Sequence, residues 1–147
     1  MYNLPKFRGN PCAALVHSDS DIAAILEESK RLSGRGDFVL MLKPSKGVEK
    51  RLLPSYIGAM IRQSEGAMRS SSLAIEVLLF VSGTMNIGNA IRRAGASGSE
   101  FVIFSSSKSL LRRMISKFRL KVLKPYPLFM DPETVGKVAI VAIKDDK

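Results

Sequence analysis

Apolar and polar positions recur along the chain with two different periods, which predicts both helices and strands. Ser18 or Asp19 is the expected N-cap of a helix with Asp21 in its first turn. The apolar residues then return every three to four positions, as Ile22 and Ile25 do, which predicts that helix. A similar pattern predicts a second helix over about 55–68. A third helix is expected after its N-cap residue, Ser107.

Short apolar runs bounded by turn residues predict the strands. Residues 38–43, the run that starts at Phe101 and the segment 137–144 have this form. The run 73–81 is apolar on both faces except at Glu76, so we expect a central strand that is covered on both sides. Strands that alternate with helices predict a mixed α/β fold, a mixed sheet with packed helices, in one compact domain over 1–147.

The stretch SGTMNIGNAIRRAG, residues 82–95, follows that run. We expect a tight glycine turn and then a short helix over 86–94 that ends at Gly95. The first amides of a helix lack internal partners and attract anions, so Ser82, Gly83 and Thr84 form a candidate phosphate site. The stretch matches neither a Walker loop nor a GxGxxG pattern, and an ordinary strand-to-helix connection is the alternative interpretation.

Charge adds to this picture, because the chain has 23 Lys and Arg against 13 Asp and Glu, a net charge of +10. Between Arg92 and Lys124 nine basic residues accompany a single acid, Glu100. Such a concentration is typical of proteins that bind a polyphosphate such as nucleic acid, and a solubilising surface is the alternative. The candidate phosphate contacts in this stretch are Arg92, Arg93, Arg112 and Arg113.

Few residues are suited to catalysis. The single cysteine, Cys12, and the single histidine, His17, predict neither a metal site nor a disulfide, and we expect no cofactor. Glu76 is the one candidate general base, and a structural role is the alternative. No apolar stretch approaches the roughly 20 residues of a membrane helix. The first residues lack the apolar core of a signal peptide, so we expect a cytoplasmic protein without a membrane partner.

The segment SSSLAIEVLLFVSGTMNIGNAIRRAG, residues 70–95, resembles the most recognisable part of the small tRNA-binding subunit of the KEOPS complex, the PRPK-binding protein family. The matching positions, in order, are Ser72, Glu76, Ser82, Gly83, Ile87, Ala90, Ile91, Arg92 and Gly95. The chain departs from the family at Met85, where a polar or basic side chain is usual. It also departs in the short segment YPLFMDPETVG, which replaces a longer helical region.

The resemblance implies a non-catalytic subunit that binds tRNA, including its 3′ CCA end, and a PRPK-type kinase/ATPase subunit. That complex makes threonylcarbamoyl-adenosine in tRNA, with the transfer chemistry in another subunit. On this interpretation Ser82, Gly83, Thr84 and Asn86 receive the 3′ end, and Arg69 closes the opposite side. No small-molecule substrate is then expected. Two alternatives stay open: a small enzyme acting on a phosphorylated metabolite, and a generic RNA-binding accessory protein.

Overall fold

The fold is built on a four-stranded antiparallel sheet. The computed structural model describes residues 10–128 apart from positions 35 and 69, so Arg69 and the predicted strand 137–144 lie outside the described residues. The strands are β1 (Cys12–His17), β2 (Val39–Leu42), β3 (Glu100–Ser105) and β4 (Lys121–Tyr126), in the order β2-β3-β1-β4. Helices pack against this sheet in a single compact domain, which confirms the mixed α/β prediction.

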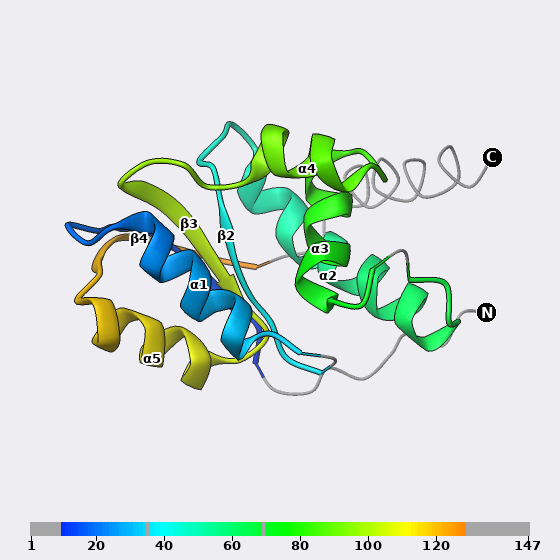
Figure 1. Ribbon diagram of the computed structural model, residues 1–147, viewed down its shortest axis with the longest axis horizontal. Coiled ribbons are helices and arrows are strands. Elements are labelled where there is room, and N and C mark those ends of the chain that lie inside the picture. The colour runs from blue at the N-terminus through cyan, green and yellow to red at the C-terminus, as the bar shows by residue number, and fades with distance from the viewer. Residues whose placement is uncertain (1–9, 35, 69, 129–147) are drawn as a thin grey trace.

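Five described helices form two layers, one on each face of the sheet (Figure 1). One layer contains α1 (Ile22–Leu32) and α5 (Lys108–Phe118), and the other contains α2 (Val48–Ser64), α3 (Leu73–Ser82) and α4 (Ile87–Ala94). Side chains of a strand alternate between the two faces. On β3, for example, Phe101 and Ile103 join the core under α1 and α5, whereas Val102 and Phe104 join the core under the other layer. The sheet therefore separates two apolar cores.

The predicted N-cap is confirmed for α5 but is wrong for α1, where Asp21 caps the helix instead of Ser18 or Asp19. Asp21 caps α1 by accepting a hydrogen bond from the Ala23 amide at 3.1 Å, and Ser107 caps α5 by accepting from the Leu110 amide at 3.2 Å. The prediction for α2 was wrong at its start, because the helix begins at Val48 and contains Pro54. Proline removes one helical hydrogen bond, but here Pro54 is buried against the core and the helix continues through it.

The predicted strand over 73–81 is wrong, because these residues form the helix α3. Every residue from Leu73 to Val81 except Ile75 is buried. A helix that is apolar on all sides belongs in the interior of a protein, and an apolar run of nine residues has the same composition as a fully buried strand. The burial of residues 73–81 on both sides was thus predicted correctly, but their backbone conformation was not.

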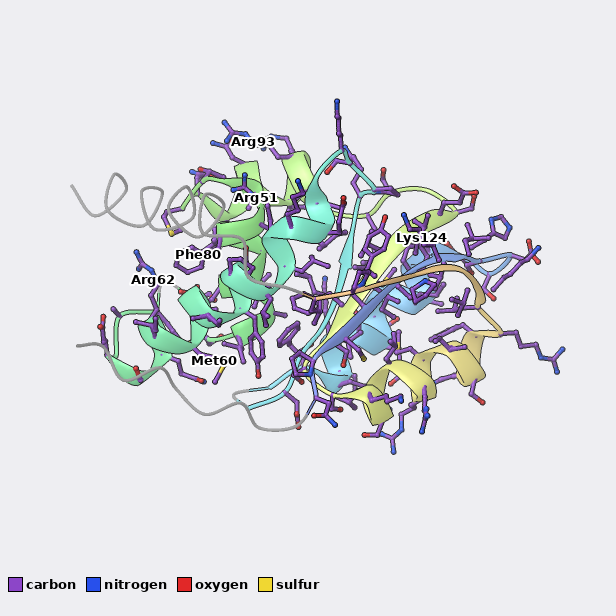
Figure 2. All side chains as sticks on the ribbon, turned by 180° about the vertical axis from the view of Figure 1, so that it is seen from behind. Arg51, Met60, Arg62, Phe80, Arg93 and Lys124 are labelled. Atoms are coloured by element: carbon purple, nitrogen blue, oxygen red, sulfur yellow. The ribbon has the colours of Figure 1, made fainter. Side chains whose placement is uncertain are left out.

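Close packing between α2, α3 and the sheet fixes the position of α3. A Cβ atom on Gly58 would lie 3.1 Å from the Phe80 ring, so the absence of a side chain there lets α2 and α3 approach closely. The Arg62 guanidinium lies 5.6 Å from the centre of the same ring (Figure 2). Under the sheet, the rings of Phe38 and Phe104 meet edge to face with centroids 5.1 Å apart.

Candidate nucleic-acid interface

The turn between α3 and α4 joins two helices, and its first residues close α3. The Gly83 and Thr84 amides donate to the Leu79 carbonyl at 3.1 and 3.3 Å, and the Ser82 hydroxyl donates to the same oxygen at 3.0 Å. Gly83 adopts φ 81°, a left-handed conformation that glycine accepts without strain. Ser82 and Gly83 therefore terminate a helix, and the predicted strand-to-helix turn is corrected to a helix-to-helix turn.

The second half of the turn begins α4. The Asn86 side chain caps this helix by accepting from the Asn89 amide at 2.9 Å, and the Thr84 hydroxyl accepts from the Asn86 amide at 3.2 Å. Asn86 is exposed and keeps its side-chain NH₂ group for an outside acceptor. The Ile87 and Gly88 amides find no acceptor among the described residues. A phosphate or sugar oxygen is the kind of group these donors would bind.

Arg51, from the second turn of α2, reaches the same turn and was missed by the sequence analysis. Its Nη2 donates to the Phe80 carbonyl at 3.2 Å and lies 3.7 Å from where a Cβ on Gly83 would be. Burial lowers the pKa of this guanidinium, although an arginine in a protein stays charged at neutral pH. Its Nε is buried and has no hydrogen-bond partner in the described part of the chain. Arg51 therefore brings a fixed positive charge to the end of α3.

Further cations lie on the β2–α2 connection and on α4, two distant parts of the sequence. The Lys43 amide donates to the Ala94 carbonyl at 2.7 Å, which joins the β2–α2 connection to the end of α4. Figure 2 shows Arg51 and Arg93 at the same end of the molecule. We use the name α2–α4 basic surface for Lys43, Lys46, Lys50, Arg51, Arg92 and Arg93. All except Arg51 are exposed.

The basic stretch 92–124 does not form one continuous surface. Arg112 and Arg113 are exposed on α5, which lies on the opposite face of the sheet from α4 (Figure 1). Lys124 lies on β4, at one edge of the sheet, and away from Arg93 (Figure 2). The structure thus places Arg92 and Arg93 on the helix that follows Ser82, Gly83, Thr84 and Asn86, with Arg92 reaching back toward Gly88, but it holds Arg112 and Arg113 on the other face of the sheet.

Glu76 is fully buried in α3, and the Ser70 hydroxyl donates to its carboxylate at 3.0 Å. It lies near the N-terminal end of the helix, whereas the turn lies at the C-terminal end. This position agrees with the structural role that the sequence analysis gave as the alternative to catalysis.

The remaining candidate groups lie on β1. Burial raises the pKa of the Cys12 thiol, and the nearby charges of Lys108 and Arg112 oppose that shift only in part. His17 Nε2 lies 3.0 Å from an oxygen of exposed Asp19. No group of three or more His, Cys, Asp and Glu residues suited to a metal ion occurs among residues 10–128 without positions 35 and 69.

No protein-family model matches the chain, and no curated protein matches it either. No single helix in the described part is long and apolar enough to cross a membrane. Only α3 and α4 taken together, across a bend of 68°, reach that length and composition.

Proposed function

We propose that this protein binds tRNA through the α2–α4 basic surface and the turn that the surface surrounds. The observation that carries the proposal is that Arg51 and Arg92 reach toward a turn with outward-facing donors, with Arg93 beside Arg92 on α4. Cations of this kind neutralise backbone phosphates, and free amides and side-chain amides bind sugar or base edges. At the turn the donors and cations of α4 are joined by Arg51 from α2, so we favour the turn over α5 as the primary contact.

The unpaired 3′ end of tRNA is the part that suits this surface. Single-stranded ends expose base edges and phosphates at the same time, and proteins bind both. Exposed Ile87, the first residue of α4, adds apolar area next to the donors of the turn. The resemblance of residues 70–95 to the tRNA-binding subunit of KEOPS supports the same assignment.

We propose further that the role is non-catalytic and that the protein works with a PRPK-type kinase/ATPase subunit in threonylcarbamoyl-adenosine formation. The runner-up, an enzyme acting on a phosphorylated metabolite, needs Glu76 as its base. Glu76 is buried in the first half of α3, whereas the turn follows the end of that helix, so its position favours the non-catalytic proposal.

The test for the turn compares two substitutions of nearly equal size, Gly83→Asp and Gly83→Asn. Asparagine and aspartate both tolerate a positive φ better than other residues, so the two variants share the same strain. Only aspartate places a negative charge beside Arg51 and the incoming phosphate. We expect Gly83→Asp to lose most tRNA affinity while Gly83→Asn keeps most of it, with equal circular-dichroism melts for the two.

Trimming the RNA tests the same contact from the other side. Removal of CCA from tRNA should cost well over the ~1 kcal/mol of one ordinary hydrogen bond. Equal affinity for intact and trimmed tRNA, together with equal binding by the two Gly83 variants, would remove the turn from the interface.

A co-purification test addresses the partner. Retention of the kinase/ATPase subunit on the immobilised protein supports the KEOPS role. RNA binding without such retention leaves the generic RNA-binding alternative.

A further inference from the structure

A cavity of about 510 Å³ lies along β2, on the edge of the sheet opposite β4, between α1 and α3. On this edge residues 94–96 pair with the end of β2. Its apolar wall contains Leu26, Met41, Ile75, Leu78, Ile91 and Ala96. Its volume falls in the range of sites for small organic ligands, which are mostly apolar with a few polar groups that fix orientation. The cavity is separate from the turn at Gly83, which does not line it.

One polar end of this cavity is the start of α3. Ser72, Ala74 and Ile75 line it, and no described side chain caps this helix. The ten-residue helix therefore presents its first amides and the partial positive charge of its dipole toward the cavity. Lys30, an exposed residue of α1, lines the same cavity and adds a full positive charge.

A second and independent donor comes from the sheet edge. The Met41 carbonyl accepts from the Ala96 amide at 3.3 Å, so the polar groups of Met41 point away from β3. In an antiparallel ladder the N–H and C=O of one residue face the same side. The Met41 N–H therefore also points away from β3, on the side of residues 94–96, and none of the described residues accepts from it. Met41 is buried, and a buried N–H without an acceptor is rare in proteins.

We propose that this cavity binds a small carboxylate with an apolar chain. The first amides of α3 and the charge of Lys30 favour a ligand that supplies acceptors and negative charge, the serine hydroxyls of the lining can donate to it, and the apolar wall takes the chain. Glu76, the buried acid of α3, does not line the cavity and therefore does not face the ligand. The proposal does not depend on RNA binding.

Two sources share this chemistry: a free apolar carboxylic acid and the C-terminal residue of a peptide. The probes are octanoate, octanol as its neutral counterpart, and a short apolar peptide with either a free or an amidated C-terminus. Backbone amide shifts are followed by ¹H–¹⁵N NMR on the full chain. We expect octanoate to shift the amides of Met41 and residues 73–75, with octanol at least tenfold weaker. A free peptide that binds more tightly than octanoate identifies a chain terminus as the source.

Two variants fill the cavity from different sides. Ile75→Trp adds bulk from α3, and Ala96→Leu adds a smaller group from the loop after α4, in case the first variant fails to fold. Each variant that folds should lose at least tenfold in octanoate affinity. Lys30→Gln should weaken octanoate but leave octanol unchanged.

Three results overturn the proposal. The first is the absence of localised amide shifts up to about 10 mM octanoate, because a specific site of this size should have a dissociation constant below that concentration. The second is equal binding of octanoate and octanol. The third is undiminished binding by folded cavity-filling variants.

Discussion

The double substitution Arg92→Gln, Arg93→Gln tests whether the α2–α4 basic surface binds RNA phosphates. Both arginines are exposed in the last turn of α4, so their loss removes two charges without opening the core. Arg92 also donates to the Asn89 side chain on the same helix, and a pair of this kind contributes little to stability. The variant should therefore keep the fold and lose two phosphate contacts.

The size of the effect follows from counterion release. Each neutralised phosphate contributes about 0.7 to 0.9 to the slope of log affinity against log salt, so two lost contacts flatten the slope by about 1.4 to 1.8. Between 50 and 200 mM salt the affinity ratio of wild type to variant should then shrink about 7- to 12-fold. Fluorescence anisotropy with labelled tRNA at several salt concentrations measures this ratio directly.

The chain supplies a matched control. Arg112→Gln, Arg113→Gln makes the same change of charge on α5, across the sheet from α4. At 0.1 M salt the screening length is about 10 Å, so charges on the far side contribute little to phosphates bound near α4. We expect this variant to flatten the slope by less than half as much. An equal or larger effect of the α5 pair would move the RNA to α5, and no effect of either pair would refute phosphate binding by both helices.

Two further predictions concern stability. Glu28 is buried and paired with Lys117 and Arg31, which hold the pKa of its carboxyl below its usual value near 4.5. A lowered folded-state pKa gives stability that is present above the unfolded pKa and is lost as pH falls through the folded pKa. The gap in urea midpoint between wild type and Glu28→Gln should thus narrow below about pH 4.5; a constant gap contradicts this. Phe104→Ala, fully buried between two rings, should lower the unfolding free energy by about 3–5 kcal/mol in urea titrations, whereas exposed Leu123→Ala should cost less than about 1 kcal/mol.

The sequence was sufficient for elements whose signals are local. The start of α5 has its capping residue at the predicted position, the apolar spacing predicted α1 although its cap is Asp21, and β2 and β3 are short apolar runs with clear ends. Signals that depend on tertiary packing gave the errors. The apolar run of α3 specifies burial without specifying conformation, and α2 extends through Pro54 because its buried face outweighs one lost hydrogen bond.

Strands β1 and β4 were not predicted. β4 contains Pro125 and is largely exposed, so neither its composition nor its hydropathy resembles a core strand. It lies at the edge of the sheet, where a missing amide is tolerated. A single sequence does not specify which strand will lie at an edge.

The candidate site was predicted in part. One turn contains the predicted residues Ser82, Gly83, Thr84 and Asn86. The helix that follows this turn carries Arg92 and Arg93, so the sequence alone keeps these two residues near the turn. Arg51 was missed because it reaches the turn from α2, thirty-two positions before Gly83, through packing alone. Arg112 and Arg113 were grouped with Arg92 because they follow it closely in sequence, but β3 carries the chain across to the other helix layer between them.

Helix α3 places the two proposed sites at its opposite ends. Its C-terminal end, closed by Gly83 and Arg51, belongs to the basic surface, and its N-terminal end, at Ser72, opens into the cavity. Ten residues at 1.5 Å each separate the two ends by about 15 Å, which exceeds the reach of any one side chain. Substitutions at one end therefore leave the contacts of the other intact: Ile75→Trp should not alter tRNA affinity, and Gly83→Asp should not alter octanoate affinity. Because each proposal has its own variants and its own ligand, the failure of one is distinguishable from the failure of the other.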